Sequence, residues 1–118
     1  MTDHNPVAIE NAIRDCANRI AKGVGVCDTR YREFLEADRA YDRAFAGAFL
    51  DHDGPQTEKR YAAERDTQDE RRARDLADAA YKHADRLAKA LTEELRSWQS
   101  VSASVRAMYQ VAGRGEGA

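Results

Sequence analysis

The stretch from Ala73 to Ala112 constrains the fold of this 118-residue chain more than any other feature. Apolar or small residues recur along it in two interleaved seven-residue series, a spacing that only a long helix brings onto one face. The first series is Ala77, Ala84, Leu91, Trp98, Val105 and Ala112, and the second is Ala73, Ala80, Leu87, Glu94, Val101 and Met108. The pattern predicts one long helix with a continuous seam of contact. Glu94 interrupts this seam, and we expect its carboxylate to reach solvent or to meet Arg14 or Arg19 of the first helix.

The composition favours an all-α fold. Charged residues make up 34% of the chain, aromatic residues make up 8%, and there are two prolines. Such a mixture is typical of helices with narrow apolar stripes. At about 25 cal/mol per Å² of buried apolar surface, a lone hairpin of such helices gains little against the entropy lost on ordering. We therefore predict an elongated, coiled-coil-like helical hairpin that self-associates as a homo-oligomer, with a short N-terminal helix and one very long C-terminal helix.

Start and stop signals predict a single helical domain over residues 1–112. Its expected helices are about 6–22, 28–51 and 57–111, with a flexible tail at 113–118. Asn5 followed by Pro6 is typical of a helix start.

Glycines supply the predicted interruptions. Gly23 and Gly25 each cost about 1 kcal/mol relative to alanine inside a helix, so we expect a loop or hinge over residues 23–26. Gly54 followed by Pro55 predicts a chain reversal after the second helix. Residues 64–72 contain nothing apolar, and they form either a solvated helix held by ion pairs or a bend in the long helix.

The most distinctive stretch, residues 97–109, contains the single Trp and four serines together with Arg, Met and Tyr. Serine at this density suits close approach of helices, and the other residue types are enriched at protein interfaces. Two interpretations stay open: a seam docked on the first helix of the same chain, or a surface for a partner or a second copy. The candidate interface residues are Leu87, Leu91, Leu95, Trp98, Val101, Val105, Arg106, Met108 and Tyr109.

Charge does not favour nucleic-acid binding. The formal net charge is −2, and acids and bases alternate along the long helix. A stripe of basic residues could still follow a phosphate backbone, and its candidate contacts are Arg65, Arg71, Arg72 and Arg74.

No catalytic, cofactor-binding or metal-binding signature stands out, so we predict no cofactor and no enzyme activity. Asp51-His52-Asp53 places a histidine between two carboxylates, but adjacent residues in a turn seldom point at one ion, and a solvated helix end explains them better. Cys16 and Cys27 are expected to be free, partly buried thiols in a reducing compartment. No signal peptide and no apolar run near 18 residues is visible, so we predict a cytoplasmic protein without a membrane segment.

Three segments carry a resemblance to known proteins. They are the aromatic second helix ending in Asp53-Gly54-Pro55, the run Ala79-Ala80-Tyr81-Lys82-His83-Ala84, and the closing stretch from Glu94 to Tyr109. In this order they resemble small helical proteins of tailed phages of actinobacteria, which are often encoded near recombination and replication genes. The resemblance implies the cytoplasm of an infected bacterium and an accessory role, with a phage or host protein as partner, and it assigns no functional residue. The leading hypothesis is therefore a non-enzymatic interaction protein, and the alternative is a nucleic-acid-contacting accessory to recombination or replication.

Overall fold

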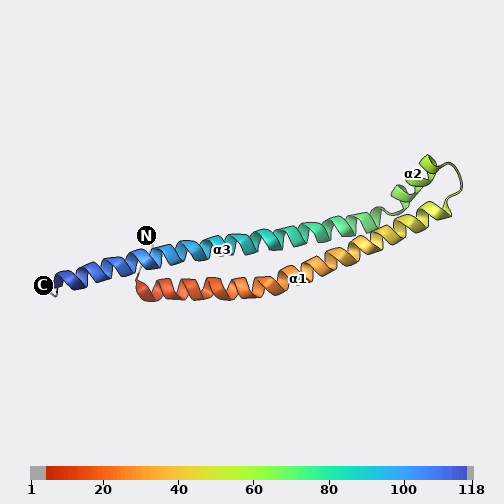
Figure 1. The fold of residues 1–118 in the computed structure, drawn as a ribbon. Helices are drawn as coiled ribbons and strands as arrows, with labels where there is room; N and C mark the ends of the chain where they lie inside the picture. Colours follow the sequence, from red (N-terminus) through yellow and green to blue (C-terminus); the bar gives the residue numbers. More distant parts are fainter. Residues whose placement is uncertain (1–4, 117–118) are drawn as a thin grey trace. The chain divides into compact units, whose positions relative to one another are not determined.

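The computed structural model describes residues 5–116, and the side chains of residues 5–113. These residues form three helices without a strand among them: α1 (Pro6–Asp51), α2 (Gln56–Asp66) and α3 (Gln68–Glu116) (Figure 1). The predicted all-α class is therefore confirmed.

Helix α1 begins as the sequence indicates and then continues past the predicted loop. The amide of Ala8 donates a hydrogen bond to Asn5 Oδ1 (2.8 Å), which satisfies one of the unpaired donors of the first turn. The helix then runs without a break through Gly23 and Gly25 to Asp51. The expected separate helices at 6–22 and 28–51 are one helix, because the cost of two glycines is small beside the cooperative gain of continuing a long helix.

The reversal after α1 lies where the sequence predicts it. Gly54 has a φ of 137°, a conformation that L side chains rarely adopt. The next residue, Pro55, caps α2, and its carbonyl accepts a hydrogen bond from the amide of Lys59 (3.0 Å). Glycine and proline thus end one helix and start the next.

Thr67 separates α2 from α3 and decides between the two interpretations of residues 64–72 in favour of an interruption. Its backbone leaves the helical region (φ −117°, ψ 24°), and its hydroxyl donates to the carbonyl of Ala63 (2.6 Å). The amide of Thr67 donates to the same carbonyl (3.1 Å). A threonine hydroxyl that competes for the i−4 carbonyl bends helices, and the predicted helix at 57–111 is therefore two helices.

The C-terminal end of α3 differs from the predicted tail. Residues 113–116 are helical, while residues 117–118 of the expected tail lie outside the described part of the chain.

The chain divides into two compact units. The first unit combines residues 1–24 with residues 86–118, and the second unit comprises residues 25–85. Each unit is described below by itself, and the prediction of one domain over residues 1–112 stays a prediction.

In the second unit, aromatic and cationic side chains join α1 to the helices that follow it. The rings of Tyr31 and Tyr81 lie 5.1 Å apart, and the guanidinium of Arg74 lies 4.6 Å from the ring centroid of Tyr41. These two contacts pair earlier residues of α1 with later residues of α3, so the two segments run antiparallel within this unit. Such cation–π and ring contacts add about 0.5–1.5 kcal/mol each to simple burial.

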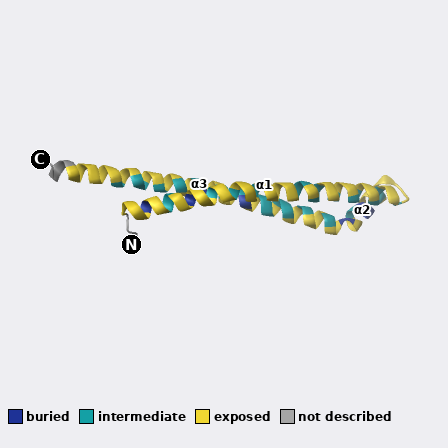
Figure 2. Ribbon diagram, turned by 90° about the horizontal axis from the view of Figure 1, so that it is seen from below, coloured by how far each residue is buried: buried dark blue, intermediate teal, exposed yellow. Residues whose placement is uncertain are grey.

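In the first unit, the start of α1 packs against the C-terminal half of α3. Ile9 and Cys16 of α1 and Leu91 of α3 are buried. Figure 2 shows buried positions, in dark blue, near the start of α1 among mostly exposed ones. Arg19 lies beside Glu94, and α1 begins at Pro6, so its first turn is level with about residue 107 of α3 at 1.5 Å per residue. The last turns of α3 therefore extend beyond α1, as Figure 1 shows.

Candidate interaction surface

The buried face of α3 in the first unit combines the first predicted series with residues that lie outside both predicted series. Leu91, Trp98 and Val105, from the first series, are buried or half-buried. Three half-buried residues complete the seam: Ala88, Leu95 and Ser102. Each follows a residue of the first series by four positions, whereas the second predicted series follows the first by three. Alternating steps of four and three residues still give the heptad spacing of helix–helix contact.

The second predicted series is therefore displaced from the seam. Leu87 and Glu94 are exposed and Val101 is half-buried, whereas Met108 lies in the last turns of α3, where every described residue from 106 to 113 is exposed. This is a correction to the expectation that both series share one face. A second series that lies three residues from the first and one that lies four residues from it both fit a heptad pattern. Which of the two is buried depends on where the partner helix packs.

The displaced series forms a second, largely exposed heptad stripe on α3. We call it the second stripe, and within the first unit it consists of Leu87, Ala90, Glu94, Ser97, Val101, Ser104, Met108 and Val111. Leu87 is 48% exposed, Met108 69% and Val111 68%, whereas Leu91 on the seam is 5% exposed. Large apolar side chains at heptad spacing on a solvent-facing helix are unusual for a surface that has no partner.

Glu94, a member of the second stripe, has the predicted ion pair. Its Oε2 lies 3.8 Å from Nη1 of Arg19, and both side chains are about half-exposed. An ion pair of this exposure contributes about 0–1 kcal/mol. The expectation that Glu94 meets an arginine of the first helix is thus confirmed for Arg19.

The buried thiol of Cys16 lies near the same carboxylate. Burial raises the pKa of Cys16. The negative charge of Glu94, and the hydrogen bond that its carboxylate accepts from the thiol, raise this pKa further. Cys16 and Cys27 are both free, as the sequence analysis expects. A neutral, buried thiol is a poor nucleophile, which points to a packing role for Cys16.

The nine candidate interface residues fall into two sets. Leu91, Leu95, Trp98 and Val105 lie on the seam, and Val101 lies half-buried at the margin of the second stripe. Leu87, Arg106, Met108 and Tyr109 are exposed. The four seam residues pack inside the unit, Val101 is partly covered, and the exposed residues are accessible to a partner, so each of the two interpretations of residues 97–109 describes part of them.

The four candidate nucleic-acid contacts are not equally accessible. Arg74 lies over Tyr41, pairs with Asp75 (3.3 Å) and approaches Asp38 (3.9 Å). Arg65 pairs with Asp66 (3.0 Å), whose carboxylate raises the pKa of the guanidinium. Arg65, Arg71 and Arg72 are exposed, and Arg74 is half-buried. Two of the four cations are thus engaged within the second unit.

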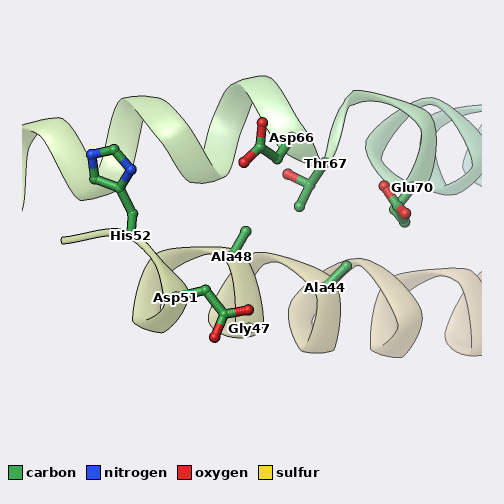
Figure 3. Close-up of a pocket in the computed structure, with 8 residues that line it drawn as sticks. All are labelled: Ala44, Gly47, Ala48, Asp51, His52, Asp66, Thr67 and Glu70. Carbon is green, nitrogen blue, oxygen red and sulfur yellow. The ribbon is translucent and has the colours of Figure 1, made fainter.

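A cavity of about 480 Å³ lies between α1 and the α2–α3 junction in the second unit. Figure 3 shows Ala44 and Ala48 of α1 facing Thr67 across it. Its other lining residues are Gly47, Asp51, His52, Asp66 and Glu70. Glu70 Oε2 is buried there without a hydrogen-bond partner, while the carboxylate of Asp51 points away from the cavity in Figure 3.

Helix α1 ends at Asp51. This agrees with the prediction that Asp51-His52-Asp53 forms the end of a helix. Within the described residues, no three His, Cys, Asp or Glu side chains are grouped so that they could hold a metal ion. None of the described helices combines the length and the apolar character needed to cross a membrane.

Comparison with known proteins does not assign the chain to a family. No protein-family model matches the chain, and neither the curated proteins nor the solved structures contain a match. The function has to be argued from the geometry above.

Proposed function

We propose that this protein is a non-enzymatic interaction protein that presents helix faces, and that it self-associates through the C-terminal half of α3. The observation that carries the proposal is the second stripe. A long helix that already has a buried seam carries a second set of large apolar residues at heptad spacing. Burying such residues gains about 25 cal/mol per Å², and among the residues whose side chains are described none covers Leu87, Met108 or Val111 beyond partial contact.

The small buried core supports the same proposal. Among the residues whose side chains are described, the large aliphatic side chains that are buried are Ile9 and Leu91, and the other buried apolar residues are cysteine and alanines. A chain of this length with so few large buried residues gains stability from association. An extended hairpin of coiled-coil type, doubled by a second copy, is the architecture that we propose.

The biological setting belongs to the same proposal. The resemblance to small helical proteins of tailed phages suggests an accessory protein in the cytoplasm of an infected bacterium, acting on a phage or host protein. Contact with nucleic acid through the exposed Arg71 and Arg72 is the alternative, and the engagement of Arg65 and Arg74 within the second unit counts against it.

Sedimentation equilibrium across a concentration series tests the proposal. We expect a reversible increase in mass that is lost in the variant Met108→Asp, because a carboxylate would have to be desolvated in the interface. Val7→Asp serves as the matched control, since Val7 is equally exposed in the first unit but lies on α1. A wild-type monomer at all concentrations, or equal loss in both variants, would contradict self-association through this surface.

A further inference from the structure

We propose that the second stripe is the docking surface for a second copy of this chain, and that the two α3 helices pair antiparallel about a twofold axis near residue 99. This inference rests on the self-association proposed above and adds its geometry. It follows from the order of large, small and polar residues along the stripe. When a second copy runs in the opposite direction, each residue of the stripe faces a residue of complementary size or polarity.

The stripe is long enough for such pairing. It extends from Leu87 to Val111 within one uninterrupted helix, a length of about 36 Å at 1.5 Å per residue. This corresponds to about three and a half heptads, the range over which heptad patterns form coiled coils. Leu87 and Val111 mark its two ends, and both are exposed.

The outer layers pair residues of complementary size. In an antiparallel coiled coil the two kinds of core position face each other, so an axis near residue 99 sets Leu87 against Val111 of the second copy. The next layer sets Ala90 against Met108 of the second copy. A long side chain facing a methyl group, and two branched chains facing each other, fill a helix interface without voids or overlap.

The inner layers pair polar with polar and small with large. Glu94 meets Ser104 of the second copy, whose hydroxyl can donate a hydrogen bond to the carboxylate. Ser97 meets Val101 of the second copy, again a small residue against a branched one. Each layer occurs twice because of the twofold axis, so the whole stripe is accounted for.

A parallel, in-register pair lacks this complementarity. It would set Glu94 against Glu94 of the second copy, where like charges repel. It would also set alanine against alanine at position 90 and serine against serine at 97, which leaves thin layers between thick ones. The antiparallel register avoids both problems, and the surface is therefore suited to a second copy in that orientation.

Charge exchange at the two ends of the stripe tests the register. The single variants Leu87→Lys and Val111→Glu each place a charge opposite an apolar residue, and we expect each to raise the dimer dissociation constant at least about tenfold. The double variant Leu87→Lys/Val111→Glu should recover affinity, since each lysine then faces a glutamate of the second copy. The two positions are too far apart on one helix to pair within a chain.

The matched control is the double variant Leu87→Lys/Ser97→Glu, whose charges do not face each other in the proposed register. It should show no recovery when its mass is measured by sedimentation equilibrium, with helix content checked by circular dichroism. Recovery in the first double variant and not in the second supports the antiparallel register. A wild-type dimer without recovery in Leu87→Lys/Val111→Glu overturns the register and leaves self-association standing, whereas a wild-type monomer overturns both.

Discussion

At the scale of single residues, the two kinds of glycine in this chain behave differently. Gly25 lies inside α1, and a Cβ added there would meet nothing within 4 Å. Gly54 has a φ of 137°, and a Cβ added there would lie 2.8 Å from Oε2 of Glu58. The first glycine lowers the stability of the helix without a structural need for glycine, whereas the turn requires the second.

The variant Gly25→Ala should therefore raise the free energy of unfolding by about 0.5–1 kcal/mol, because alanine loses less backbone entropy in a helix. Urea denaturation followed by circular dichroism measures the change. Gly54→Ala, the control, should lower the stability instead, since alanine is strained at this φ. A Gly25→Ala variant less stable than the wild type would show that α1 does not continue through residue 25.

The Cys16 thiol makes stability depend on pH. Because burial and Glu94 raise its pKa, the folded state keeps the thiol proton at a pH at which the unfolded chain releases it. The contribution of Cys16 is thus complete below the ordinary thiol range, and it is lost as the pH rises through the folded pKa.

We expect the urea midpoint to fall between about pH 7 and about pH 10, and to fall less in the variant Cys16→Ala, which has no thiol to titrate. All other side chains are the same in both proteins, so the difference between the two slopes reports Cys16 alone. Equal slopes would mean that the thiol keeps an ordinary pKa.

At the scale of elements, α3 carries two adjacent stripes with different roles. The seam at Leu91 is buried against α1 in the first unit, and the second stripe at Leu87 is exposed. The two leucines are four residues apart and are therefore neighbours on the helix surface, but Leu87 is 48% exposed and Leu91 5% exposed. Their contributions to folding should differ accordingly.

Leu91→Ala should destabilise the chain by about 2–5 kcal/mol, since it leaves a cavity in a small core. Leu87→Ala should cost about 0.5 kcal/mol or less when the protein is dilute enough to be monomeric. Thermal unfolding of both variants at low concentration makes the comparison. Equal destabilisation would place both leucines on the seam, contrary to the structure.

At the scale of the whole molecule, the proposed association and the alternative of nucleic-acid binding respond differently to salt. The second stripe is mostly apolar and small, with Glu94 as its one charged member. Apolar association depends little on ionic strength, whereas each phosphate neutralised by an arginine adds to a steep salt dependence.

The mass measured by sedimentation should therefore stay nearly constant between about 0.05 and 0.5 M NaCl, a range over which exposed charges become strongly screened. Binding to DNA, if present, should weaken steeply over the same range and be reduced in Arg71→Ala/Arg72→Ala. A dimer that dissociates with salt would point to charged contacts in place of the second stripe.

Much of the helical architecture could be predicted from local chemistry. Asn5 and Pro6 start α1, and Gly54 with Pro55 ends one helix and begins the next, because capping and left-handed φ depend on the residues present at that position. The break at Thr67 was open between two interpretations, since a threonine hydroxyl bends a helix in one setting and is harmless in another. The continuity through Gly23 and Gly25 was missed, because propagation of a long helix outweighs two local penalties.

The sequence by itself determined that this chain is all helical and that α3 carries heptad-spaced apolar residues. It also indicated that the carboxylate of Glu94 would reach solvent or meet an arginine of the first helix; Arg19 lies beside it, and the side chain stays about half-exposed. Only the tertiary structure decided which residues face α1, because heptads offset by three and by four residues are equally regular in a sequence. The packed helix covers Leu91, Leu95 and Trp98 and leaves Leu87 exposed, while Met108 lies in turns of α3 that extend beyond α1. Together these two facts create the surface on which the proposed function rests.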